Sequence, residues 1–153
     1  MHVHVGRESL GVLELKRLVE FVNHRNGKEL LWKMAGRSNS SYAQVVETNS
    51  KYVLREQRER YRALNLAKEH TVEFRIFQGT LDWNRFLRNL EFVDAACYFV
   101  KDGGGDWRQF SEWMMKKKWG RWPRVESWLG KEGLAKGEKL GRDGRPLFIE
   151  TAA

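Results

Sequence analysis

The sequence predicts an α+β fold, with helices packed on one face of a small antiparallel sheet and a helical segment at the C-terminal end. Residues 2–5 and 71–77 alternate polar and apolar side chains, as half-buried strands do. Residues 82–100 instead carry a broad apolar stripe at helical spacing. The length of 153 residues is enough for one hydrophobic core.

The first hundred residues hold the predicted sheet and the helices that cover it. In order, we expect a strand at 2–5, a helix capped by Ser9 and ended by Asn26 and Gly27, a short helix at 29–34, and a long polar loop at 36–50. A charged strand or loop at 51–59 follows, then strands at 61–66 and 71–77, which residues 67–70 join as an antiparallel hairpin.

The remaining residues are predicted to be mainly helical. Helices are expected at 106–118 and 122–129, and Pro123 suits the first turn of the second one. Beyond Gly130 the chain is rich in Gly and Lys, which predicts an extended or loosely ordered tail. The predicted organisation is therefore a half-domain at 1–100, a helical extension at 101–130 and a tail at 131–153.

The composition limits the classes of partner without choosing one. The net charge of +8 is spread along the chain and permits an acidic ligand, a nucleotide or a nucleic acid. The single cysteine, Cys97, excludes an internal disulfide and fits a small buried hydrophobe in a cytoplasmic protein. No apolar run is long enough to span a bilayer, so no membrane partner is expected.

The alternation places His2, His4, Glu73 and Arg75 on one open face, if their two strands share a sheet. A carboxylate and an imidazole can bind a divalent metal, and a guanidinium can bind the oxygens of a phosphate beside it. Alternate residues of a strand are about 6.6 Å apart. One histidine is therefore expected to bind the metal and the other to contact a nucleotide or orient a neighbour.

Several stretches resemble one family of enzymes. Residues 1–7, MHVHVGR, are similar to a His-x-His strand, and Arg37 followed by Tyr42 is similar to a central loop. Residues 61–66, YRALNL, and 71–81, TVEFRIFQGTL, resemble a hairpin that ends in a Glu-x-Arg strand. Together they resemble the phage and bacterial amidoligases of the glutamine-synthetase-like superfamily, over roughly residues 1–100.

The resemblance implies an ATP-dependent ligase that joins a carboxylate to an amine. In that family ATP phosphorylates the carboxylate, and the amine then attacks the acyl phosphate. The resemblance implies ATP and Mg²⁺ as cofactors and a nucleotide and a peptide carboxylate as ligands. It assigns, by matching position, His2 and Glu73 as metal ligands, Arg75 and Arg62 as catalytic residues, and His4 and Arg37 as cofactor-binding residues.

The chain departs from the family pattern ahead of His2. The family takes most of its metal-binding carboxylates from a Glu-x-Glu strand that precedes the His strand, whereas this sequence starts at Met1. We therefore expect a gene fragment, an internal start or a truncated relative, with one Glu and one His where hard cations need several oxygen ligands. The predicted protein is amidoligase-like with an incomplete active site.

Other interpretations stay open. His2 and His4 can belong to a frayed terminal strand, and Glu73 and Arg75 can form an exposed ion pair. The protein can instead be a non-catalytic phage-type inhibitor of a host factor in the host cytoplasm, such as an anti-CRISPR protein. It can also form a homo-oligomer. The charge run of Arg55, Arg58, Arg60 and Arg62 is a solvated basic edge or an anion-binding edge. A third set either binds nucleic acid or docks helices onto the core: Trp107, Trp113, Trp119, Trp122 and Trp128, with Lys116, Lys117, Lys118, Arg121 and Arg124.

Overall fold

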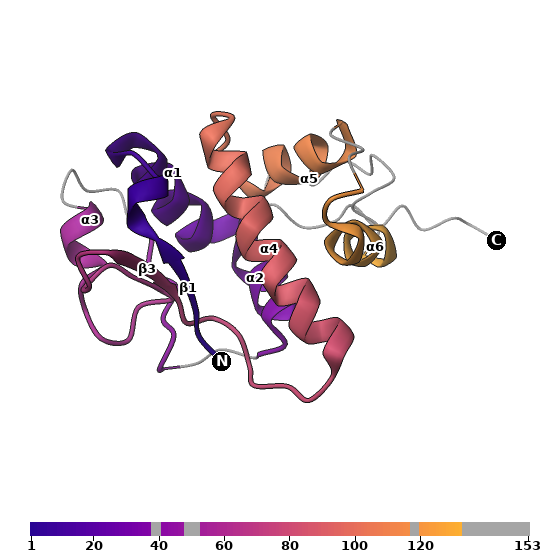
Figure 1. Ribbon diagram of the computed structural model, residues 1–153, viewed down its shortest axis with the longest axis horizontal. Helices are drawn as coiled ribbons and strands as arrows, with labels where there is room; N and C mark the ends of the chain where they lie inside the picture. Colours follow the sequence, from indigo (N-terminus) through magenta and orange to yellow (C-terminus); the bar gives the residue numbers. More distant parts are fainter. Residues whose placement is uncertain (38–40, 48–52, 117–119, 133–153) are drawn as a thin grey trace.

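The computed structural model describes residues 1–37, 41–47, 53–116 and 120–132. It has the α+β fold that the sequence predicts, with a three-stranded antiparallel sheet and helices packed against it. Figure 1 shows the sheet on one side of the long helix α4, with α5 and α6 on the other side.

The sheet has the order β1-β3-β2, so β3 is the central strand. Its strands are β1 (Val3–Gly6), β2 (Leu64–Asn65) and β3 (Thr71–Phe74). The register places His4 opposite Glu73 on one side and Asn65 opposite Glu73 on the other. The predicted hairpin and the single sheet are both confirmed.

Helices α1 (Val12–Asn23), α2 (Lys28–Ala35) and the single turn α3 (Val53–Glu56) lie between β1 and β2, and α4 (Trp83–Lys101) follows β3. Helix α4 begins where the Asp82 side chain accepts a hydrogen bond from the Arg85 backbone N–H, as an N-cap residue does. Helix α2 ends at Gly36, whose φ of 68° is a left-handed conformation that suits glycine.

The core lies between the apolar face of the sheet and the helices. Val72 and Phe74 of β3 are fully buried. One hydrophobic core includes residues from both predicted regions, 1–100 and 101–130. The Phe21 ring stacks on the Trp107 ring with their centroids 4.9 Å apart, which joins α1 to α5. Gly27 lies against the same indole, so that a Cβ at this position would be only 1.7 Å from a ring carbon of Trp107.

Helices α5 (Trp107–Lys116) and α6 (Pro123–Lys131) cover the far side of α4. The side chains of Trp107, Trp122 and Trp128 are buried, and Pro123 lies in the first turn of α6 as predicted. Helix docking is confirmed for these three tryptophans. Trp113 is half-buried, and nucleic-acid binding by this segment stays a prediction. Trp119, Lys117 and Lys118 lie outside the described residues, as does the tail from residue 133.

Several predicted boundaries need correction. Gly11, not Ser9, precedes α1, because the Ser9 hydroxyl donates to the Gly6 carbonyl within a short 3-10 turn, and the helix already ends at Asn23. The expected strands 61–66 and 71–77 shrink to two and four residues. The charged stretch 51–59, predicted as a strand or a loop, holds α3, and its first two residues lie outside the described part of the chain.

Two composition-based predictions bear on the rest of the molecule. Cys97 is buried, and burial, reinforced by nearby Asp94, raises the pKa of its thiol to about 12. No helix among the described residues is long and apolar enough to cross a bilayer.

Candidate functional site on the open face of the sheet

The polar face of the sheet gathers three side chains around one carboxylate oxygen of Glu73. Oε1 of Glu73 lies 2.7 Å from Nδ1 of His2, 3.9 Å from Nε2 of His4 and 3.6 Å from Nε of Arg75. Strand pairing is the cause: cross-strand partners project to the same face, and alternate residues of each strand follow them. We call these four residues the Glu73 cluster.

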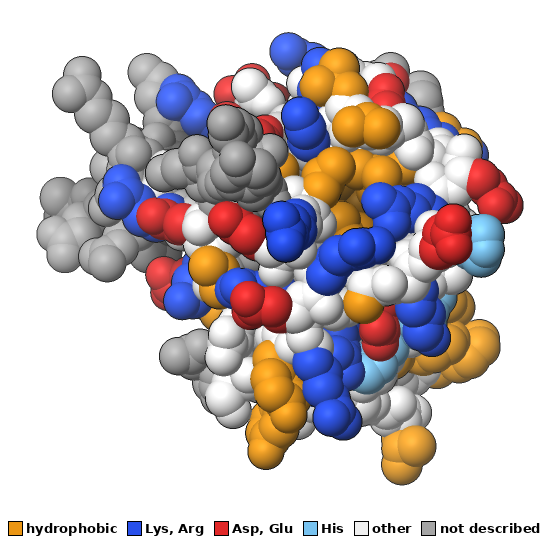
Figure 2. Space-filling view, turned by 90° about the vertical axis from the view of Figure 1, so that its left-hand side faces the viewer, with side chains coloured by type: hydrophobic (Ala, Val, Ile, Leu, Met, Phe, Trp, Pro, Cys, Tyr) orange, Lys and Arg blue, Asp and Glu red, His pale blue; other side chains and the backbone are white. Residues whose placement is uncertain are grey.

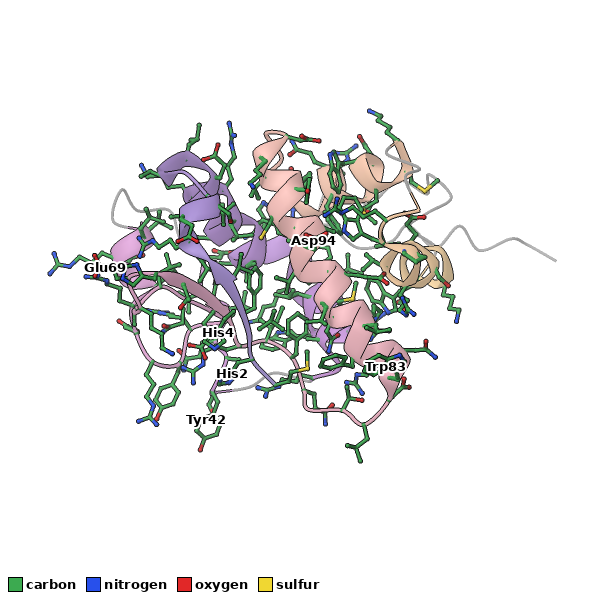
Figure 3. All side chains as sticks on the ribbon, viewed as in Figure 1. His2, His4, Tyr42, Glu69, Trp83 and Asp94 are labelled. Carbon is green, nitrogen blue, oxygen red and sulfur yellow. The ribbon has the colours of Figure 1, made fainter. Side chains whose placement is uncertain are left out.

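The two histidines form the accessible edge of the Glu73 cluster. Their side chains are 43% and 40% exposed, whereas the Glu73 side chain is only 12% exposed. Figure 3 shows His2, just before β1, close to His4 of that strand, with Tyr42 projecting beyond His2 away from the body of the molecule. A ligand that approaches this face therefore meets the imidazoles before the carboxylate.

The charge of His2 follows from its surroundings. Partial burial lowers the pKa of His2 below the ordinary value of 6.5, and Arg75 and the Met1 ammonium act in the same direction. The Glu73 carboxylate opposes this shift without reversing it. Near neutral pH the imidazole is therefore mostly uncharged, and its Nδ1 lies within hydrogen-bonding distance of Glu73.

Arg75 is the permanent cation of the cluster. Its side chain is 18% exposed, its Nη1 donates to the Arg60 carbonyl, and its buried Nε makes no hydrogen bond within the described structure. Arginine has five N–H donors in a fork that matches the oxygens of a phosphate or a carboxylate. The contact with Arg60 fixes this fork at the edge of the open face.

The other two predicted site residues lie at its margins. Arg62 is held by the preceding turn, because its Nη2 lies 2.7 Å from the Glu59 carboxylate and its Nε donates to the Glu56 carbonyl. Arg37 lies close enough to Met1 to lower the pKa of the terminal ammonium, after the larger effect of burial. The structure thus gathers His2, His4, Glu73 and Arg75 and places Arg62 on the turn before β2 and Arg37 near Met1.

Two further features lie near this face, and neither was predicted as a site from the sequence. Asn65 stands opposite Glu73, but it is buried and its amide is used locally, donating to the Glu59 carbonyl and accepting from the Ala67 N–H. Tyr42 and Tyr61 form an exposed edge-to-face pair with ring centroids 5.6 Å apart. Tyr61 and Asn65 lie on the same side of the alternating stretch 61–66, and this alternation was the sequence signal for both residues.

The described residues do not fit a divalent-metal centre. None of their His, Cys, Asp and Glu side chains form a group of three or more that could hold a metal ion. The one carboxylate, Glu73, already faces the Arg75 guanidinium, which would repel a cation at the same oxygen. A Mg²⁺–ATP centre would need further oxygen ligands.

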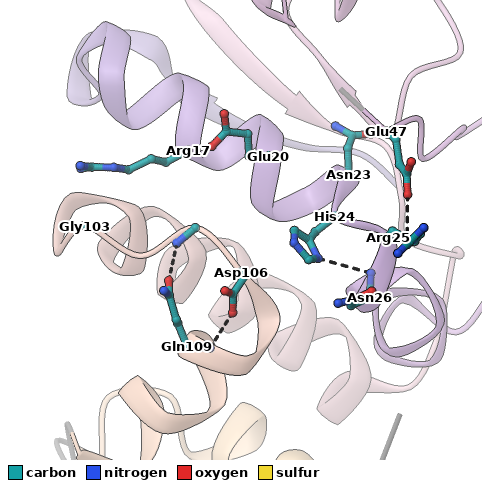
Figure 4. Close-up of a pocket in the computed structure, with 11 residues that line it drawn as sticks. Arg17, Glu20, Asn23, His24, Arg25, Asn26, Glu47, Gly103, Asp106 and Gln109 are labelled. Carbon is teal, nitrogen blue, oxygen red and sulfur yellow. Dashed lines mark hydrogen bonds and ion pairs between the residues drawn. The ribbon is translucent and has the colours of Figure 1, made fainter. Parts of the chain in front are cut away.

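A separate cavity of about 720 Å³ opens between α1 and the turn that leads into α5. Figure 4 shows its mixed lining: Arg17 and Glu20 come from α1, His24 from the end of that helix, and Asp106 and Gln109 from the start of α5. Much of this lining is engaged locally. His24 Nδ1 accepts from the Asn26 N–H, and the Asp106 carboxylate accepts from the Gln109 N–H.

Comparisons with known proteins add no relative. The chain matches no protein-family model, no curated protein and no solved structure. Function therefore has to be argued from the residues and their arrangement.

Proposed function

We propose that this chain is an amidoligase-like protein whose open sheet face binds an anionic group, either the phosphate of a nucleotide or the carboxylate of a peptide. The convergence of His2, His4 and Arg75 on one oxygen of Glu73 is the observation that carries this proposal. An arrangement that served only the fold would not require two exposed imidazoles beside a guanidinium.

The role of each group follows from its chemistry. Arg75 supplies the permanent positive charge and the planar fork for two ligand oxygens. At the accessible edge His4 supplies an N–H donor, whereas neutral His2 directs its Nδ1–H to Glu73 and presents its Nε2 as an acceptor. Binding by Arg75 would then depend on salt only moderately, because its side chain is largely shielded from solvent.

The proposal assigns binding, and not complete ligation, to the described residues. The amidoligase reaction requires Mg²⁺ as well as ATP, and these residues do not fit the metal centre by themselves. We therefore expect the isolated chain to bind ATP or ADP without releasing phosphate from ATP.

Calorimetric titration with inorganic phosphate, ADP, ATP and a peptide carboxylate, with and without Mg²⁺, tests the proposal. We expect saturable binding of at least one anion. Arg75→Ala should weaken the affinity roughly tenfold or more, since a charged hydrogen bond contributes about 1.5–3 kcal/mol. Arg75→Lys should have a smaller effect on the affinity, because it keeps the positive charge.

The matched control is Arg108→Ala, which removes an exposed arginine from α5 on another part of the molecule. Its affinity should equal that of the unchanged protein. The proposal fails if no anion binds, or if Arg75→Ala and Arg108→Ala have the same effect.

A further inference from the structure

An exposed surface of tyrosines and arginines borders the Glu73 cluster, and the proposed function does not use it. It consists of Tyr42 and Tyr61 with Arg55, Arg58 and Arg60, and we call it the Tyr–Arg surface. The backbone brings its two parts together: the Gln44 N–H donates to the Tyr61 carbonyl, and the Ala63 N–H donates to the Gln44 carbonyl.

The tyrosines offer aromatic surface to solvent. Tyr42 is 69% exposed and Tyr61 is 43% exposed, and their rings meet edge to face at 76°. The Arg60 guanidinium lies over the Tyr61 ring, 5.7 Å from its centroid. Isolated exposed aromatics are common, but a pair with an arginine above one ring is a platform on which planar groups stack.

The arginines of the surface are available for a ligand. Arg55, Arg58 and Arg60 are exposed, and no ion pair to any of them occurs within the described ranges. The neighbouring acid Glu59 is instead neutralised by Arg62, at 2.7 Å. Figure 2 shows this side of the molecule, where Lys and Arg side chains gather with fewer acidic side chains between them.

We propose that the Tyr–Arg surface binds single-stranded nucleic acid, with bases stacked on Tyr42 and Tyr61 and phosphates on Arg55, Arg58 and Arg60. Exposed aromatic rings beside arginines that form no ion pair among the described residues match a flexible strand, whose bases and phosphates alternate along its length. A duplex hides its base faces and would use the arginines alone. Trp107, Trp122 and Trp128 cannot take this role, because their side chains are buried.

Fluorescence anisotropy with a labelled oligonucleotide of about ten nucleotides tests this inference. We expect Tyr42→Ala and Tyr61→Ala each to weaken binding of a single strand by about 5- to 100-fold, and the corresponding Phe variants to retain it. Because three arginines meet phosphates, log K should fall with log salt at a slope of about −2, at roughly 0.7 per phosphate.

The controls separate this inference from the proposed anion site. Glu73→Ala and His2→Ala change the Glu73 cluster and should leave oligonucleotide affinity within about twofold. Trp83→Ala removes another exposed aromatic, at the start of α4, and should have no effect. Absence of binding at low salt, equal affinity for duplex and single strand, or unchanged affinity in both Tyr→Ala variants would overturn the inference. Phosphate or nucleotide binding in the same preparation would be unaffected by that failure.

Discussion

Two glutamates of this molecule are almost equally buried, yet their surroundings differ. Glu91 of α4 is 13% exposed and uses both oxygens: Oε1 accepts from Nη1 of Arg124 at 2.7 Å, and Oε2 accepts from the backbone N–H groups of Arg124 and Val125. Glu73 is 12% exposed, but the contacts with His2, His4 and Arg75 all meet at Oε1.

The difference separates a structural carboxylate from a candidate binding carboxylate. Glu91 satisfies backbone N–H groups that the first turn of α6 leaves unpaired, so it fastens α6 to α4. Glu73 satisfies no backbone group in the described contacts, and it lies behind two exposed imidazoles. The first arrangement stabilises the fold, and the second presents functional groups to solvent.

The largest effect is expected from Glu91→Ala. It leaves the α6 N–H groups and the Arg124 guanidinium without their acceptor, so the free energy of unfolding should fall by about 3 kcal/mol. Urea denaturation measures this change. Glu91→Gln keeps an acceptor oxygen and should lower the free energy of unfolding by less. A decrease under about 0.5 kcal/mol for Glu91→Ala would contradict the structural role assigned to Glu91.

A smaller loss is expected from Glu73→Ala. The variant removes a partly shielded ion pair with Arg75 and the contact with His2, which should lower the free energy of unfolding by about 1 kcal/mol or less. The same urea experiment checks it. A loss equal to that of Glu91→Ala would mean that the Glu73 cluster serves the fold.

The arrangement around Glu73 was predictable from the sequence, whereas that around Glu91 was not. Two-residue alternation places side chains of paired strands on one face, and so the sequence alone groups His2, His4, Glu73 and Arg75. Glu91 meets α6 through the packing of α4 against a distant helix, and no local pattern encodes that contact. The sequence indicates where α6 begins, through Pro123, but not that Glu91 contacts this helix.

The helices and strands differ in the same way in how far the sequence predicts them. The long apolar stripe over residues 82–100 predicted α4 almost to its observed limits, Trp83–Lys101. The strand at 61–66 was too long, because the chain before Leu64 turns to let Arg62 reach Glu59 and Glu56. Tertiary contacts of single side chains decide such short boundaries, and alternation cannot reveal them.

The smallest effect concerns pH. Because the folded protein lowers the pKa of His2, the folded state binds fewer protons than the unfolded state as the pH falls below the ordinary value of 6.5. The stability contributed by uncharged His2 is therefore present above that value and lost as the pH falls through the folded-state pKa. Urea midpoints between about pH 8 and about pH 5 should fall less steeply in His2→Gln. An unchanged pH profile in this variant would contradict the assignment.

The imidazole signals of His2 and His4 test the central claim most directly, because they report on the accessible edge of the Glu73 cluster. In an NMR titration with inorganic phosphate, we expect both signals to shift with one saturable curve. The shifts should disappear in Arg75→Ala and persist in Glu91→Gln. Signals that stay unchanged, or that shift equally in the Arg75→Ala protein, would contradict the account.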